Sequence, residues 1–162
     1  MRIFVAGASG LIGVRLVPLL VAAGHEVAGM TRSPEKASTL KDLGAEPVVC
    51  DVFDAGALAE AVAAYEPDTV FHQMTDLPDD VTEMASFGAR NDRVRSEGTR
   101  NLLAAAVEAV RSAHEGGLRF GGDVVICAHG LHEAPGGHGE DLTAALHAGA
   151  VTGDAAVVLE IG

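Results

Sequence analysis

The chain has 162 residues, a length that suits one domain with a sizeable core. Its formal net charge is −12 and it has no basic stripe, so a nucleic-acid partner is not expected. Apolar residues make up 48% of the chain and aromatic residues 4%, which suits the buried strands of a parallel α/β sheet. No apolar run approaches the ~18 residues of a spanning helix, and no secretory signal is evident. We therefore expect a cytoplasmic protein with no membrane partner.

Strand and helix patterns alternate along the first two thirds of the chain. The first strand, around Ile3–Val5, breaks into the glycine-rich turn Gly7–Gly13. Further strands are predicted over 25–30, 47–50 and 69–74, with helices over 11–23, from Pro34 to Leu43, from a cap at Asp54 to before Pro67, and over 89–113. Ser33 is the predicted N-cap of the second helix. This alternation predicts a Rossmann-like α/β fold, a doubly wound parallel sheet in three αβα layers.

The last third of the chain has weaker signals. Strands are predicted over 123–128 and 155–161, with a short helix over 141–148. We therefore interpret 1–162 as a single Rossmann-like domain in which 1–110 follows the pattern and 111–162 diverges from it.

The turn Gly7–Gly13 is the strongest functional signal. A strand that runs into a glycine turn and then a helix directs backbone N–H groups and a positive helix end at one place, which suits a diphosphate. Gly7 allows a sharp turn, Gly10 has no side chain that would keep a pyrophosphate away from the backbone, and Gly13 lets the helix lie close on the strand. The G-x-x-G-x-x-G spacing inside a βαβ pattern predicts a dinucleotide site, and a tight turn without ligand is the alternative.

Residues after the second predicted strand should contact the adenosine ribose. An acid there favours NAD, whereas an arginine pairs with the 2′-phosphate of NADP. The candidates Thr31, Arg32 and Ser33 include no acid. Arg32 offers a charge-assisted fork, Ser33 offers a hydroxyl and an N–H, and Lys36 adds charge. We predict NADP, with NAD as the alternative cofactor and an exposed loop arginine as the other interpretation of Arg32.

Asp51 and Val52 follow the third predicted strand, where the adenine ring lies in such a fold. Asp51 is a candidate acceptor for the adenine amino group, and Val52 is a candidate to pack on the ring. A plain turn residue is an equal alternative for Asp51.

Three stretches resemble the NAD(P)-dependent epimerase/dehydratase family, the extended and atypical short-chain dehydrogenase/reductases: Ile3–Gly13, Asp51–Val52 and Glu97–Ala106. The resemblance implies a Rossmann fold, a nicotinamide cofactor and, often, a sugar-nucleotide or other small carbonyl or hydroxyl substrate. By position it implies a pyrophosphate cradle made of Gly7, Ser9, Gly10, Leu11, Ile12 and Gly13. It also implies that Arg32 sits at the ribose and Asp51–Val52 at the adenine.

The chain departs from that family at the catalytic centre. The family moves a proton with a Tyr-x-x-x-Lys pair on the helix after the fifth strand, where the lysine lowers the pKa of the tyrosine. Here the single tyrosine, Tyr65, lies too early, and no lysine follows Lys41. Catalytic residues are therefore unassigned, and whether the chain is an enzyme stays open.

Two accounts of this departure compete. In the first, the chain is truncated or altered and its tail after residue 110 is foreign sequence, an account favoured because Glu97–Ala106 is so close to the enzyme pattern. In the second, the chain is a non-catalytic NAD(P)-binding regulator or sensor of the NmrA-like kind. The substrate is unassigned beyond a small molecule, and the oligomeric state, with a homodimer as one option, is left open.

Other candidate groups are better explained structurally. The arginines of the 89–113 helix (Arg90, Arg93, Arg95 and Arg100) are expected to form a solvated face paired with Asp92 and Glu97. The tail residues His129, His132, Glu133 and His138 lack the spacing of a helical zinc site, so no metal is expected. Cys50 and Cys127 are expected to be buried free thiols, and a nucleophilic pair of Cys127 with His129 is disfavoured.

Overall fold

The computed structural model describes residues 1–76, 78, 82, 84–115 and 156–159. Its strands are β1 (Arg2–Ala6), β2 (Glu26–Thr31), β3 (Glu46–Val49), β4 (Thr69–His72) and β5 (Ala156–Leu159). Its helical segments are α1 (Gly13–Ala22), η1 (Pro34–Lys36), α2 (Ala37–Asp42), α3 (Ala55–Tyr65), α4 (Met84–Arg93), η3 (Val94–Gly98) and α5 (Thr99–Glu115).

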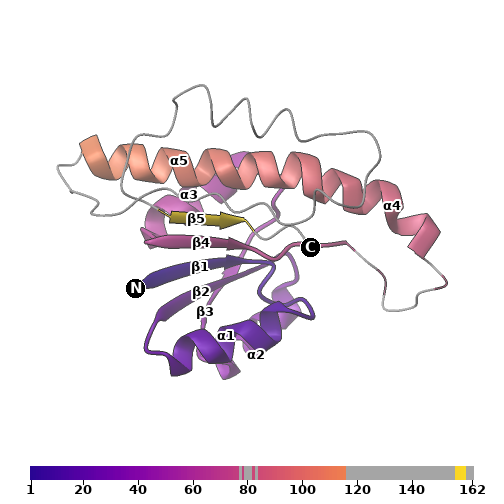
Figure 1. Cartoon of the computed structure of the whole chain (residues 1–162), viewed down its shortest axis with the longest axis horizontal. Helices are drawn as coiled ribbons and strands as arrows, with labels where there is room; N and C mark the ends of the chain where they lie inside the picture. The colour runs from indigo at the N-terminus through magenta and orange to yellow at the C-terminus, as the bar shows by residue number, and fades with distance from the viewer. Residues whose placement is uncertain (77, 79–81, 83, 116–155, 160–162) are drawn as a thin grey trace.

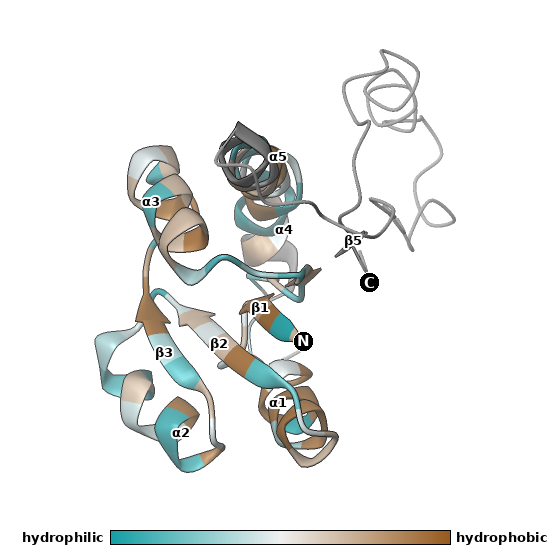
Figure 2. Cartoon of the chain, turned by 90° about the vertical axis from the view of Figure 1, so that its left-hand side faces the viewer, coloured by the Kyte–Doolittle hydropathy of each residue, from teal (hydrophilic) through white to brown (hydrophobic). Residues whose placement is uncertain are grey.

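The strands form one parallel sheet in the order β3-β2-β1-β4-β5. Helices α1 and α2 cover one face of the sheet, and α3 and α5 cover the other (Figure 2). The strands run in the same direction towards one edge of the sheet, and α4 extends beyond that edge (Figure 1). The doubly wound, three-layer arrangement predicted from the sequence is confirmed.

Alternation along β1 divides the core into two clusters. Ile3 and Val5 point towards α1 and α2, whereas Phe4 and Ala6 point towards α3 and α5, because successive strand residues face opposite sides. The first cluster also contains Ala8, Val17, Val27, Leu40 and Ala45. The second contains, among others, Met30, Leu58, Val62, Val70 and Leu102. Both faces of β1 are therefore buried, as its unbroken apolar sequence requires.

The strand order places the switch point of the sheet between β1 and β4. The connection from β1 leads to β2 on one side, while the segment after β4 leads to helices on the opposite side. The two segments diverge at the carboxyl edge, which is where open α/β sheets bind ligands. The glycine turn after β1 lies at this edge (Figure 1).

Most local predictions agree with the structure, although some element boundaries are displaced. Asp54 caps α3 as expected, since its Oδ1 accepts a hydrogen bond of 3.0 Å from the Ala57 N–H. The strand predicted over 155–161 is present as β5 beside β4. The helix predicted from residue 89 instead begins at Met84, because α4 accommodates Gly88, a poor helix former, in its interior. Strand 123–128 and helix 141–148 lie outside the described residues.

Two further findings concern expectations made from composition. None of the helices described combines the length and the apolar character that crossing a bilayer requires. Cys50 is a buried free thiol, as predicted, and burial raises its pKa. Cys127 lies outside the described residues.

His72 ends β4 as a fully buried histidine. The Met74 N–H donates to its Nδ1 at 3.3 Å, so the proton of the neutral ring lies on Nε2, which is 2.9 Å from the Thr99 hydroxyl oxygen. Burial lowers the pKa of His72 below its ordinary value of 6.5. The neutral ring thus links the end of β4 to the start of α5.

This burial predicts a pH-dependent stability. The unfolded chain binds a proton at His72 more readily than the folded chain does, so stability is full above about pH 6.5 and falls as the pH decreases from there. Urea unfolding of wild type at pH 7.5 and 5.5 should show this loss, and His72→Leu should reduce it.

A matched control is Thr69→Val on the same strand. The Thr69 hydroxyl is buried without a partner among the described residues, so its removal changes no titrating group and should keep the wild-type pH dependence. An unchanged pH dependence in His72→Leu would show that other groups cause the loss.

Candidate nucleotide-binding site

The glycine turn begins with a backbone-to-backbone contact. Gly7 has φ +86°, and a Cβ built on it would lie 2.5 Å from the Gln73 carbonyl oxygen that follows β4. Only glycine therefore combines this conformation with this approach. The next residue, Ala8, donates its N–H to the Met30 carbonyl of β2 at 3.0 Å. The turn is thus fixed between the ends of β2 and β4.

Gly10 and Gly13 have different surroundings. A Cβ on Gly13 would overlap the Ala8 carbonyl, so this glycine sets how closely α1 lies against the turn. A Cβ on Gly10 would meet only the Gly7 carbonyl oxygen, at 3.3 Å, and otherwise open space. The site therefore allows a ligand to approach the backbone at Gly10, as predicted for a diphosphate.

The start of α1 faces the same opening. Its N-cap, Ile12, makes no side-chain cap hydrogen bond, while the N–H groups of Val14 and Arg15 donate to the carbonyls of Gly10 and Ile12, both at 3.0 Å. Leu11 and Ile12 are 76% and 56% exposed. The helix begins two residues later than predicted, which leaves Leu11 and Ile12 in the turn. The positive end of α1 and the open space at Gly10 make this a place for an anion.

Hydroxyl groups connect the turn to the end of β2. The Ser9 hydroxyl lies 2.8 Å from the Thr31 hydroxyl, and Thr31 Oγ1 also accepts the Ser33 N–H at 3.2 Å. Ser33 occupies the N-cap position of η1, as predicted, but its side chain makes no cap hydrogen bond. The structure therefore brings Ser9 and Ser33 together through Thr31, which is buried.

Arg32 leaves β2 beside this hydroxyl cluster. Its side chain is half exposed, and its Nη2 donates to Asp76 Oδ1 at 3.1 Å. Asp76 follows β4, is buried, and also accepts hydrogen bonds from Arg90 of α4. Arg90 is therefore not part of a helix face paired with Asp92 and Glu97, because the docking of α4 turns it towards Asp76.

The contacts of the loop after β3 stabilise the loop itself and its packing against the helices. Asp51 Oδ1 accepts the Phe53 N–H at 3.0 Å, a turn-stabilising bond that leaves its other carboxylate oxygen without a partner among the described residues. Val52 is buried, and a Cβ on Gly98 would lie 3.1 Å from its Cγ1. The Val52 carbonyl accepts from Asn101 Nδ2 at 2.9 Å. The adenine roles of Asp51 and Val52 stay predictions.

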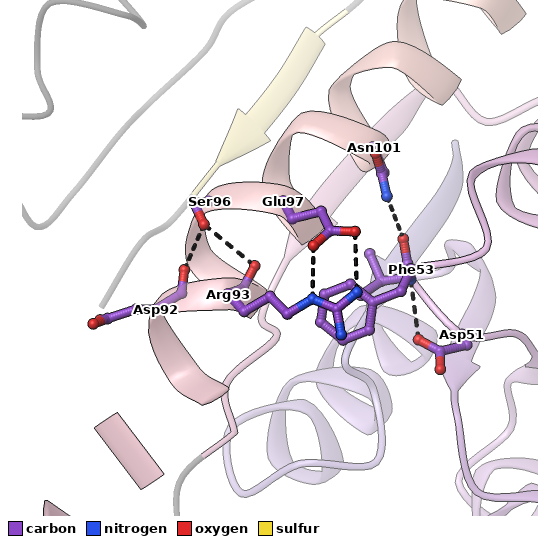
Figure 3. Close-up of polar contacts among 8 residues, drawn as sticks. Asp51, Phe53, Asp92, Arg93, Ser96, Glu97 and Asn101 are labelled. Atoms are coloured by element: carbon purple, nitrogen blue, oxygen red, sulfur yellow. Dashed lines mark hydrogen bonds and ion pairs between the residues drawn. The ribbon is translucent and has the colours of Figure 1, made fainter. Parts of the chain in front are cut away.

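Arg93, the last residue of α4, lies over the loop that follows β3 (Figure 3). Its guanidinium lies 3.9 Å from the centroid of the Phe53 ring and forms hydrogen bonds of 2.6 and 3.2 Å with Glu97. The hydrogen bond from Arg93 lowers the pKa of the Glu97 carboxyl. The predicted pairing with Glu97 is thus confirmed for Arg93, which is also tied to the β3 loop by its ring contact.

Tyr65 lies at the opposite edge of the sheet from the glycine turn. Arg2, which begins β1, donates from Nε to the Tyr65 carbonyl at 3.0 Å, and its guanidinium lies 4.7 Å from the centroid of the ring. Burial raises the pKa of the phenol, and its hydroxyl has no partner among the described residues. The single tyrosine of the sequence is therefore remote from the glycine turn.

The part of the chain that the structure describes contains no group of three or more His, Cys, Asp or Glu side chains arranged to hold a metal ion. The tail residues considered above (His129, His132, Glu133, His138 and Cys127) lie outside the described residues. Sequence reasoning missed Asp76 and Asn101. The available signals were that Asp76 is an acid shortly after the fourth strand and that Asn101 is a polar residue in the Glu97–Ala106 stretch.

Comparison with known proteins agrees with this geometry. A 3-diazoavenalumate denitrifying reductase of Streptomyces sp is 41% identical over 116 residues, which are 70% of this chain and 34% of that protein. A 3-beta-hydroxysteroid dehydrogenase of Mycolicibacterium neoaurum is 36% identical over 110 residues, 67% of this chain and 29% of that protein. This chain thus spans about a third of the length of these relatives.

Solved structures include the UDP-glucose 4-epimerase of Thermus thermophilus in complex with NAD. It is similar to this chain with a TM-score of 0.58 and 25% identity, covering 85% of this chain and 42% of that chain. Residues 3–117 match the model of the NAD dependent epimerase/dehydratase family. With a parallel sheet in the order found here and a glycine turn at its switch point, the chain belongs to the NAD-dependent epimerase/dehydratase family.

Proposed function

We propose that this chain binds NADP(H) in preference to NAD(H) and provides the nucleotide-binding part of an oxidoreductase. The observation that carries the preference is Arg32, which directly follows β2 and whose half-exposed guanidinium is held by Asp76. No carboxylate occupies positions 31–33 to accept bonds from ribose hydroxyls. A guanidinium fork suits a phosphate on that ribose.

The chain's own residues would bind and orient the dinucleotide. The positive end of α1 suits the diphosphate, and the open space at Gly10 lets it approach the backbone. The bond between Ser9 and Thr31 holds the turn at a fixed distance from the end of β2, where the ribose would lie. When bound, the nicotinamide ring supplies hydride transfer chemistry.

The substrate class we propose is a small carbonyl or hydroxyl compound, or a sugar nucleotide. Support comes from the names of similar proteins, which include a reductase, a hydroxysteroid dehydrogenase and a UDP-glucose epimerase. We also propose that the protein acts in the cytoplasm, since Cys50 is a free, buried thiol, as is usual in a reducing compartment.

A second candidate function is a non-catalytic NAD(P)-binding regulator or sensor. The observation that favours it is the lack of any Tyr-x-x-x-Lys pair, because Tyr65 is the only tyrosine and Lys41 the last lysine. An inactive truncated chain is the third account. A regulator binds cofactor without turnover and changes its affinity for a partner, an enzyme consumes NADPH with a carbonyl substrate, and an inactive fragment binds neither cofactor.

Cofactor preference is tested by calorimetric titration of NADP and NAD into wild type and Arg32→Asp. We expect wild type to bind NADP more tightly and Arg32→Asp to lose about tenfold or more in NADP affinity, because a carboxylate replaces the guanidinium beside the phosphate. The affinity for NAD should stay the same or rise.

The matched control is Arg111→Asp, which makes the same charge change at an exposed arginine paired with Glu108 in α5. It should leave both affinities unchanged. An Arg32→Asp variant with wild-type NADP affinity would contradict the assignment of Arg32 to the ribose phosphate.

The glycine turn is tested by the pair Gly10→Ala and Gly13→Ala. Gly10→Ala should keep the urea midpoint close to wild type and weaken dinucleotide binding about tenfold or more, because the methyl group occupies the open space next to the cradle. Gly13→Ala should lower the free energy of unfolding by about 2 kcal/mol or more, because its methyl group overlaps the Ala8 backbone. Unchanged binding by a folded Gly10→Ala variant would exclude a ligand at this turn.

A further inference from the structure

Asp76 connects the end of β4 with two arginines from separate elements. Its Oδ1 accepts hydrogen bonds from Arg32 and Arg90, both at 3.1 Å, and its Oδ2 accepts one from Arg90 Nε at 3.0 Å. Its own N–H donates to Asn91 Oδ1 at 3.1 Å. The carboxylate is 9% exposed, whereas each arginine side chain is 54% exposed. Asp76 is therefore a nearly buried charge whose two partners both reach solvent.

The two arginines bind Asp76 unequally. Arg90 uses Nε and Nη2 in a two-point contact, and its guanidinium also lies 4.6 Å from the centroid of the Phe87 ring. Arg32 uses a single N–H. A guanidinium has five N–H donors, and among the described residues no other group accepts from Arg32. Arg90 is thus committed to Asp76, while most of the hydrogen-bonding capacity of Arg32 remains free.

The charges of the three groups do not cancel. One carboxylate and two guanidinium groups sum to a single positive charge, and the two-point contact assigns the compensation of Asp76 mainly to Arg90. With Arg90 absent, Asp76 would neutralise Arg32 and would itself repel an anion placed beside it. The surplus charge therefore resides on Arg32, the arginine at the end of β2.

We propose that Arg90 and Asp76 determine the specificity of this site for a 2′-phosphorylated adenosine, an inference that rests on the proposed preference for NADP. Asp76 orients Arg32 through one hydrogen bond, and Arg90 cancels the charge that Asp76 would otherwise present to the phosphate. Arg32 contacts the phosphate, and Arg90 and Asp76 are positioning residues that act through it.

The experiment measures the dissociation constants of adenosine 2′,5′-diphosphate and 5′-AMP by calorimetry. These probes differ only in the 2′-phosphate, so the ratio of their dissociation constants reports discrimination for that group alone. Wild type should prefer the diphosphate. Arg90→Gln should reduce this ratio about tenfold, the scale of one charge a few ångströms away at a partly exposed position, with little change for 5′-AMP.

The double variant Asp76→Asn/Arg90→Gln separates charge balance from packing. Once Asp76 is neutral, Arg90 is no longer needed, so the ratio should recover towards the wild-type value. A purely structural role of the pair in docking α4 predicts a further loss instead. Arg90→Lys keeps the positive charge without the two-point contact and should retain most of the discrimination, which keeps the test informative if Arg90→Gln folds poorly.

The control is Arg111→Gln, which removes one positive charge from the exposed pair with Glu108 and should leave the ratio unchanged. An unchanged ratio in Arg90→Gln, or no recovery in the double variant, overturns the inference and leaves the role of Arg32 standing. A wild-type protein that binds both probes equally overturns the proposed preference for NADP, and the inference with it.

Discussion

The site depends on a contact between backbones rather than between side chains. Gly7 and Gly13 let the turn after β1 touch the carbonyls of Gln73 and Ala8, with no room for a Cβ at either position. This contact holds the start of α1, with its positive helix end, at the carboxyl edge of the sheet. The hydroxyl link from Ser9 to Thr31 then fixes the distance from the turn to the end of β2.

Around this rigid turn, the polar groups come from elements that follow the other strands. Arg32 follows β2, Asp51 follows β3, and Asp76 follows β4, so the carboxyl edge of a parallel sheet gathers residues that are far apart in sequence. Helices α4 and α5 complete the edge, with Arg93 lying on the Phe53 ring and Asn101 bonded to the Val52 carbonyl (Figure 3). A nucleotide at this edge would meet charged side chains that hydrogen bonds hold in place, on a chain whose net charge is −12.

Sequence reasoning succeeded where the signal is local. The glycine spacing, the Asp54 cap and the periodicity of the strands depend on residues within one element, so the fold and the position of the glycine turn could be predicted. The start of α4 was placed late because Gly88, a poor helix former, lies directly before the predicted start at residue 89. The ion pairs of Asp76 could not be predicted, since Arg32 lies 44 residues before it and Arg90 reaches it only through the docking of α4.

The π-helical segment η3, Val94–Gly98, joins α4 to α5 in one continuous rod (Figure 1). A π turn holds one more residue than an α turn, so it changes the angular phase between the side chains before and after it. Downstream, Leu102 points into the core, while upstream Arg90 points to Asp76. Each residue turns an α-helix by about 100°, so removing one residue here would rotate Arg90 away from its carboxylate. The number of residues in this segment therefore determines whether Arg90 can pair with Asp76 at the carboxyl edge of the sheet.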